Sequence, residues 1–322
     1  MASRESNLID ALRALATHPA ARGLRDDTAV LPVEAGALVL TQDMLVEGVH
    51  FLPDDPADSV AWKLVAVNMS DLAAKGAVPL GVLTGHGMGR DAAWDALFVE
   101  GLAEALRAFD VPLLGGDTVA MPEGAPVTLG LTAIGRASAS GAPARSGAKP
   151  GDELWVCGPI GDAGAGLAIR QGRLNGALAS LVDAYLRPQP NLPLGQALAP
   201  LVSAMADVSD GLLIDAQRIA AASGYGMAIR LDAVPLSDAL LMVRPDTLET
   251  RMEAVTAGDD YVLLFTAAPA QREAIDAVSL RHGGRARRIG ICSADRGLTL
   301  SWRDKAVPLP ARMGFQHGEI QP

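Results

Sequence analysis

Seven aspartates in this chain lie among small residues, in the short contexts that hard-metal ligands usually occupy. A carboxylate at the end of an apolar strand, or inside an apolar helix, gains nothing from burial unless a cation compensates its charge. Magnesium fits best, because it combines one or two carboxylates with substrate phosphates and retained waters. The seven are Asp26, Asp27, Asp43, Asp71, Asp117, Asp207 and Asp210.

Each of these acids has a simpler interpretation when it is taken alone. Asp210 precedes a predicted helix and could cap it, and Asp117 follows two glycines and could be a turn residue. Asp71 is harder to explain, because it falls near the C-terminal end of a helical pattern, where the helix dipole disfavours an anion. Five separate acidic sites at the junctions of apolar elements favour shared metal ions.

Three further features could contact a phosphate or a substrate. The glycine-rich segment 158–166 follows a predicted strand, so its N–H groups could meet a phosphate, although a plain strand-to-helix turn explains it better. Arg145 lies in a loop of Gly and Pro, where it is either an exposed charge or a guanidinium clamp on a phosphate. His50 has no second histidine at ligand spacing, and a lone histidine is more often structural.

Composition narrows the classes of partner. The chain has 322 residues, which fits two domains, and 49% of them are apolar, which supports sizeable buried layers. Aromatic residues make up only 4%, and the net charge is -10, so nucleic acids and anionic membranes are not expected partners. A phosphate ligand would need metal ions to invert the local charge.

The same composition leads us to expect a cytoplasmic protein. Cys157 and Cys292 each lie in an apolar run, which favours two buried thiols over a zinc site. No stretch of about 18 apolar residues occurs, and the first residues lack the order of a signal peptide.

The hydrophobic pattern predicts two mixed α/β units, joined by the Gly- and Pro-rich segment 138–152. In the first unit it predicts helices at 6–17, 59–75 and 91–109, and strands at 28–31, 37–41, 79–86, 111–114 and 126–135. In the second unit it predicts helices at 163–171, 177–186, 194–202, 211–222 and 269–281, and strands at 153–157, 204–208, 226–231, 260–266 and 287–292.

The order of the motifs is that of a known family. They are Asp26-Asp27-Thr28-Ala29-Val30, Asp43-Met44-Leu45-Val46-Glu47-Gly48-Val49-His50-Phe51, Asn68-Met69-Ser70-Asp71, Gly115-Gly116-Asp117-Thr118, Arg145-Ser146-Gly147, Asp207-Val208-Ser209-Asp210-Gly211 and Gly258-Asp259-Asp260-Tyr261. From about residue 6 to 317, the chain resembles the thiamine-monophosphate kinase family, within the superfamily of aminoimidazole-ribonucleotide synthetase.

The resemblance implies an enzyme that transfers the γ-phosphoryl group of ATP to thiamine monophosphate, in line and with several Mg²⁺ ions, giving thiamine diphosphate and ADP. It implies an aminoimidazole-ribonucleotide synthetase-like fold of two domains and a homodimer. Residues 1–140 would bind ATP and metal and pair their sheets in a β-barrel-like dimer. Residues 148–322 would form the C-terminal α/β domain that completes an active site between the domains.

The resemblance also implies a role for individual residues. Metal ligands would be Asp27, Thr41, Gln42, Asp43, Asp71, Asp117, Asp207 and Asp210, of which Asp43, Asp71, Asp117 and Asp210 are the catalytic candidates. ATP would contact Gly116, Asp117, Arg145 and Ser209. Thiamine monophosphate would contact His50, Asp259 and Phe315.

The chain departs from the family pattern at several of these positions. Arg25 replaces a usual glycine, Gln42 a usual threonine, and Asp259 a usual glutamate, while Val262 stands where an acid is common. The alternatives are another ATP-using enzyme of the superfamily and a non-catalytic nucleotide-binding homodimer. Retention of all the metal-position aspartates argues against the second alternative, because a chain released from catalysis has no reason to keep so much like charge together.

Overall fold

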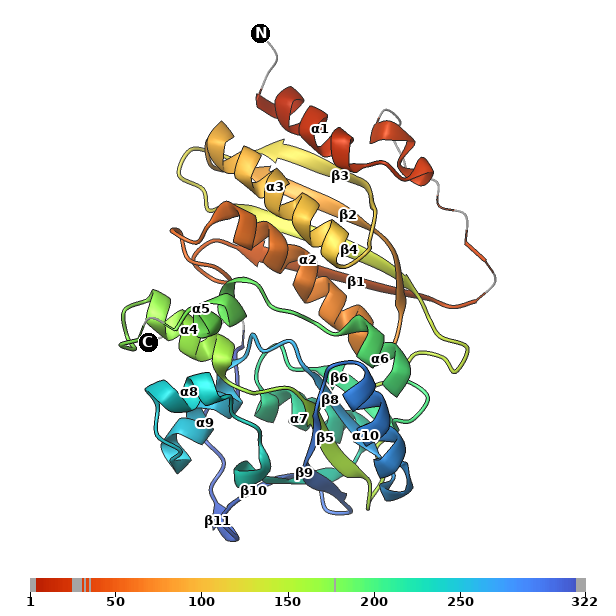
Figure 1. Cartoon of the computed structure of the whole chain (residues 1–322), viewed down its shortest axis with the longest axis vertical. Helices are drawn as coiled ribbons and strands as arrows, with labels where there is room; N and C mark the ends of the chain where they lie inside the picture. The colour runs from red at the N-terminus through yellow and green to blue at the C-terminus, as the bar shows by residue number, and fades with distance from the viewer. Residues whose placement is uncertain (1–3, 25–30, 32, 35, 177, 317–322) are drawn as a thin grey trace. The chain divides into compact units, whose positions relative to one another are not determined.

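The computed structural model describes residues 4–24, 31, 33–34, 36–176 and 178–316. The chain forms two compact units, one of residues 1–72 and 77–137 and the other of residues 73–76 and 138–322 (Figure 1). Both units are mixed α/β, as the sequence predicts. None of the described helices is long and apolar enough to cross a lipid bilayer.

The first unit is built on a four-stranded sheet in the order β1-β4-β2-β3. The strands are β1 (Leu38–Val46), β2 (Val78–Met88), β3 (Leu113–Ala120) and β4 (Thr128–Arg136). β4 pairs antiparallel with β1 and β2, whereas β2 and β3 are parallel. The sheet is open, with β1 and β3 at its edges, so one chain does not close a barrel.

Two long helices cover one face of this sheet (Figure 1). They are α2 (Ala57–Ala74) and α3 (Ala92–Ala108), and α3 is capped by Asp91, whose side chain accepts the Trp94 N–H. Burial alternates along β4, where Leu129 and Leu131 are 0% and 1% exposed, because every second side chain points toward the helices. The other face of β1 keeps large apolar residues in solvent: Leu38, Leu40 and Met44 are 44%, 65% and 52% exposed.

The N-terminal elements lie beside the β3 edge. They are α1 (Arg4–Leu15) and η1 (Pro19–Leu24), which both contact β3, and α1 also contacts α3. The predicted strand at 28–31 lies outside the described residues except for Leu31, which is not in a strand.

The second unit contains a seven-stranded sheet in the order β11-β10-β7-β9-β5-β8-β6. The strands are β5 (Glu153–Cys157), β6 (Ala204–Asp207), β7 (Gly226–Arg230), β8 (Leu263–Ala267), β9 (Ala286–Ser293), β10 (Gly297–Trp302) and β11 (Lys305–Val307). All neighbours are antiparallel except β7 and β10.

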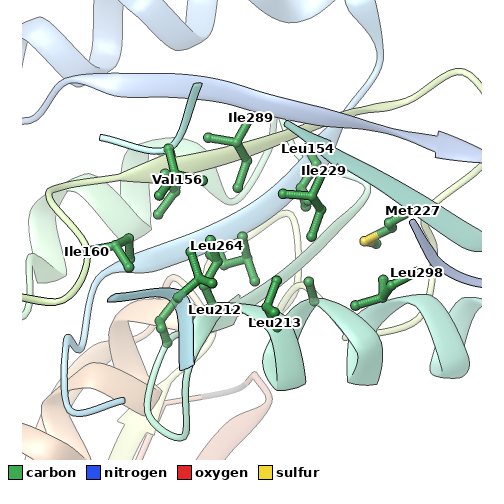
Figure 2. Close-up of a cluster of buried hydrophobic side chains, with 14 of the residues drawn as sticks. Leu154, Val156, Ile160, Leu212, Leu213, Met227, Ile229, Leu264, Ile289 and Leu298 are labelled. Carbon is green, nitrogen blue, oxygen red and sulfur yellow. The ribbon is translucent and has the colours of Figure 1, made fainter. Parts of the chain in front are cut away.

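The second unit packs its core between the sheet and α7 (Leu212–Ser223) (Figure 2). Leu212 and Leu213, each 0% exposed, meet strand residues such as Leu154, Ile229 and Leu264. Burying one such leucine contributes roughly 1.5–3 kcal/mol. The other helical segments are α4 (Asp162–Arg170), α5 (Ala179–Leu186), α6 (Leu192–Leu198), η2 (Leu231–Ala233), α8 (Asp238–Val243), α9 (Leu248–Ala257), η3 (Pro269–Gln271) and α10 (Arg272–Arg281).

The strands β1 and β3 run well past their predicted C-terminal ends, and this changes where the acids lie. β1 continues to Val46, so Asp43 lies inside a strand, and β3 continues to Ala120, so Asp117 is in a strand and not in a turn. The pattern missed both extensions because polar and glycine residues interrupt the apolar runs. It also missed α8, α9, β10 and β11, which are short or weakly periodic.

Candidate active site

The contact between β1 and α2 gathers hydroxyl and carboxylate groups in the first unit. Thr41 Oγ1 donates to Asp71 Oδ2, and the Asp43 N–H donates to Asn68 Oδ1 at 3.2 Å. Asn68 is 0% exposed and its Nδ2 donates to the Leu64 carbonyl at 3.0 Å, so it is locked in place. Because side chains alternate along a strand, Thr41 and Asp43 lie on the same face, toward α2. Their oxygens are the ligands that Mg²⁺ prefers.

Gln42 and Asp117 lie on the opposite face of the same sheet. The register places four residues in one row across the strands: Met44, Gly130, Gly85 and Asp117. Asp117 is therefore three strand spacings from β1, about 14 Å. Gln42 and Asp117 both line a cavity of 910 Å³ on this face. Within one chain the sheet thus separates Asp117 from Asp43 and Asp71.

Gly116 and Arg145, both expected at ATP, lie in segments with tightly fixed backbones. A Cβ on Gly116 would fall 2.2 Å from the Thr84 carbonyl oxygen, so β2 and β3 can pair here only with glycine at this position. The Arg145 loop is held by the Ser223 hydroxyl, which accepts the Gly147 N–H at 3.2 Å and donates to the Arg145 carbonyl at 3.3 Å. The Arg145 side chain is exposed. A fixed backbone under an exposed guanidinium suits an anion clamp.

His50 lies in the turn that follows β1. Its Nδ1 accepts the Val46 N–H at 3.0 Å, which fixes the orientation of the imidazole. Glu47, in the same motif, is used for structure: its carboxylate accepts hydrogen bonds from Arg90 and, at 3.1 Å, from the Val127 N–H. Glu47 therefore serves the structure of this turn.

The second unit carries its acids in the loop between β6 and α7. Asp207 is 3% exposed at the end of β6. The N–H groups of Ser209 and Asp210 both donate to Asp215 Oδ2, each at 3.1 Å. Arg218 Nη1 donates to Asp210 Oδ2 at 2.5 Å and to Asp215 Oδ1 at 2.7 Å. Asp215 and Arg218 thus hold the loop in shape from the first turns of α7.

The charges in this cluster depend on one another. Burial raises the pKa of Asp215, and the Arg218 guanidinium opposes that shift. Burial acts to lower the pKa of Arg218, but the carboxylates of Asp210 and Asp215 raise it above its ordinary value. Arg218 is therefore a permanent cation beside Asp210. Our sequence reasoning missed both Asp215 and Arg218, although a buried acid inside an apolar helix is the same signal that singled out Asp71.

The predicted substrate residues are tied to this loop by their backbones. Three hydrogen bonds of 2.7, 2.8 and 2.8 Å run from N–H to carbonyl: Asp259 to Ser209, Tyr261 to Val208, and Phe315 to Asp210. Asp259 and Tyr261 have φ angles of +62° and +48°, which is unusual without glycine. Tyr261 Oη donates to Asp259 Oδ1 at 3.0 Å and aligns that carboxylate.

The glycine-rich segment 158–166 is not open to a phosphate at its central N–H. The Gly161 N–H, at the start of α4, donates to Asp260 Oδ1 at 2.9 Å. Asp260 Oδ2 is buried and has no hydrogen-bond partner within the described residues. Burial raises the pKa of Asp260 well above its ordinary value. The chain's own carboxyl group therefore occupies the position that a phosphate would take.

The donors fit magnesium in type, although each unit supplies only part of a set. They are carboxylate, hydroxyl and amide oxygens, which Mg²⁺ binds in preference to softer ligands. Over the part of the chain that the structure describes, no group of three His, Cys, Asp or Glu is close enough to hold a metal ion. Asp26 and Asp27 lie outside the described residues. Substrate phosphates and waters would complete such sites.

Known proteins resemble the chain along nearly its whole length. The family models of the N-terminal and C-terminal domains of AIR synthase related proteins match residues 25–137 and 149–303. The thiamine-monophosphate kinase of Caulobacter vibrioides is 39% identical over 306 residues, which cover 93% of this chain and 86% of that protein.

Solved structures agree with the sequence comparison. The crystal structure of thiamine-monophosphate kinase from Stenotrophomonas maltophilia K279a matches with a TM-score of 0.83 and 36% identity, over 93% of this chain and 96% of that one. AaThiL complexed with AMPPCP and TMP matches with a TM-score of 0.77 and 28% identity, over 91% of each chain. The chain therefore belongs to the thiamine-monophosphate kinase family of AIR synthase related proteins.

Proposed function

We propose that this chain phosphorylates thiamine monophosphate with ATP, giving thiamine diphosphate and ADP. The observation that carries the proposal is the structural match, over nine tenths of both chains, to a relative complexed with AMPPCP and TMP. Three relatives that are 39–43% identical over 81–93% of this chain are thiamine-monophosphate kinases, which supports the same activity. ATP is then the co-substrate, and the acceptor is an anionic phosphate.

In this reaction the protein mainly has to position the two substrates and neutralise the charge of their phosphate groups. Phosphoryl transfer needs little covalent work from side chains, and an acceptor phosphate is already ionised near neutral pH, so no general base is required. Bound Mg²⁺ ions would offset the repulsion between the two phosphate groups. Thr41, Asp43 and Asp71 would hold metal in the first unit, and Asp207 and Asp210 in the second.

The remaining residues would orient the two substrates for in-line transfer. Gly116, Asp117, Arg145 and Ser209 would contact ATP, with the exposed Arg145 guanidinium on a phosphate. His50, Asp259 and Phe315 would contact thiamine monophosphate. The hydrogen bonds that join Asp259 and Phe315 to the 208–210 loop support this grouping.

We further propose that two copies form a homodimer through the open face of the first unit's sheet. That face exposes Leu40 and Met44, at 65% and 52%, which is costly for a monomer. It also carries Asp117, which the sheet separates from Asp43 in one chain. Because β1 is an edge strand, a second copy packed on this face would bring its Asp117 to that edge, beside the metal ligands of the first, and residues 1–140 would then serve both ATP binding and dimerisation.

Formation of thiamine diphosphate from ATP and thiamine monophosphate tests the function. We expect product with Mg²⁺, none with excess chelator, and none when free thiamine replaces the monophosphate as acceptor. ATP that binds while no thiamine diphosphate forms would overturn the proposal, and would favour another acceptor or a nucleotide-binding role.

A further inference from the structure

Lys63 is a buried lysine with no role in the site described above. It lies in α2 among apolar residues, is 2% exposed, and its Nζ donates to the His50 backbone carbonyl at 3.2 Å. Burying an ammonium group is expensive, and an apolar residue of the same length would pack as well in such a helix. The hydrogen bond to His50 is thus a polar contact that packing alone does not require at this position.

The group that Lys63 holds is a single turn with a histidine at its centre. The Val46 carbonyl accepts the His50 N–H at 2.9 Å, and the Val46 N–H donates to His50 Nδ1 at 3.0 Å. Lys63 holds the remaining polar backbone atom of His50, its carbonyl oxygen. The backbone and the ring of His50 are thus fixed from two directions, by the end of β1 and by α2.

This arrangement selects one form of the imidazole. Nδ1 can accept the Val46 N–H only when it carries no proton, because a protonated Nδ1 would oppose one N–H with another. The ring is therefore neutral with its proton on Nε2. The Nε2–H of a neutral imidazole is a hydrogen-bond donor, and a phosphate oxygen can accept a hydrogen bond from it.

We propose that Lys63 is a positioning residue that presents the His50 imidazole, in its Nε2–H tautomer, to thiamine monophosphate. The inference rests on the proposed function, in which His50 contacts that substrate. α2 also holds Asp43 through Asn68 and Thr41 through Asp71. Lys63 thereby anchors the turn of the predicted substrate residue to the same helix that aligns the predicted metal ligands of the first unit.

The experiment compares two substitutions at Lys63 with the same change at another lysine. Lys63→Met removes the ammonium group but keeps most of the side-chain volume, and Lys63→Gln keeps a neutral N–H donor. Lys75→Met is the matched control, because Lys75 Nζ also donates to a backbone carbonyl, that of Met205, at 3.0 Å. The measurements are KM and kcat for thiamine monophosphate, and the ¹⁵N chemical shifts of the His50 ring in the full chain.

If Lys63 positions His50, Lys63→Met raises KM about tenfold, the lower end for loss of a charged hydrogen bond, with kcat within about twofold of the original. The His50 ring shifts then move from one tautomer to a mixture, Lys63→Gln recovers part of both effects, and Lys75→Met changes neither.

The inference is wrong if a folded Lys63→Met variant keeps the His50 shifts and the KM of the original chain, or if Lys63→Gln is no closer to the original chain than Lys63→Met. It is also wrong if Lys63→Met and Lys75→Met alter KM equally, since both would then act through general stability. Failure of the proposed function is distinguishable, because the original chain would then lack activity on thiamine monophosphate whatever the ring shifts of the variants.

Discussion

At the scale of single residues, the predicted metal ligands are held by ordinary hydrogen-bond donors. Thr41 donates to Asp71, and Arg218 donates to Asp210 at 2.5 Å. These hydrogen bonds hold each carboxylate in place. A metal ion would have to displace these donors from the carboxylate oxygens. Binding would then depend on the negative charge of each acid, so an uncharged side chain of the same shape should lower the rate of catalysis.

We expect Asp43→Asn and Asp210→Asn each to lower kcat by at least about a hundredfold, because each removes a charge that would neutralise phosphate oxygens. Both side chains are partly exposed, so the fold should survive. Steady-state rates, with circular dichroism to check folding, measure the effect. Near-normal rates in both variants would contradict the assignment of metal ligands.

Asp259→Glu should lower KM for thiamine monophosphate, because the usual glutamate of the family reaches one methylene further. The φ angle of +62° is one that Asp tolerates better than Glu, so the variant should also lose about 1 kcal/mol of stability. Initial rates against substrate concentration and urea unfolding test the two parts. An unchanged or raised KM would reject the first.

At the scale of elements, the buried strand β5 begins with a charged residue, Glu153, that the hydrophobic pattern does not explain. Glu153, the first residue of β5, is 2% exposed and accepts hydrogen bonds from Arg272 at 2.7 Å and Arg288 at 2.6 Å. These contacts join β5 to α10 and β9. The hydrogen bond from Arg272, helped by Arg288 and opposed by burial, lowers the pKa of Glu153.

The lowered pKa of Glu153 predicts an acid-sensitive part of the stability. A group whose pKa falls on folding stabilises the protein above its unfolded pKa, about 4.3 for glutamate, and loses that effect as the pH falls further. Glu153→Gln should therefore be less stable than the original chain at neutral pH, and the difference should shrink toward about pH 3. Urea unfolding at several pH values measures this, and a difference independent of pH would contradict it.

The sequence predicted most helices and most strands of both units, because their apolar periodicity is strong. It ended the predicted strand at residue 114 and so left Asp117 outside β3, because two glycines resemble a turn unless the neighbouring strand is known. It could not predict that Asp43 and Asp117 lie on opposite faces, since this depends on the pairing register of four strands. Asp260 at Gly161 was equally hidden, because the two residues are 99 positions apart.

At the scale of the whole molecule, the open sheet of the first unit is the face through which we propose that two copies form a dimer and share active-site residues. If Asp117 of one copy serves the site of the other, then Asp43→Asn and Asp117→Asn chains should complement each other. Random pairing leaves half of the dimers mixed, and one of the two sites in each mixed dimer is intact, so about a quarter of full activity should return.

The complementation is measured by mixing the two inactive chains, allowing subunits to exchange, and assaying thiamine diphosphate. Each variant alone, carried through the same exchange, is the control. Activity no higher than that of the separate variants, once mixed dimers have been detected, would show that Asp117 acts within its own chain or not at all.

The joined loops of the second unit also have a dynamic consequence. Asp259 and Tyr261 cannot swing outward unless their N–H groups leave the carbonyls of Ser209 and Val208, and these two residues lie between Asp207 and Asp210 in the chain. The two loops should therefore open together in one cooperative event, with amide protons that exchange at a common rate. A product that leaves past Asp259 must either dissociate while both loops are closed or wait for both loops to open.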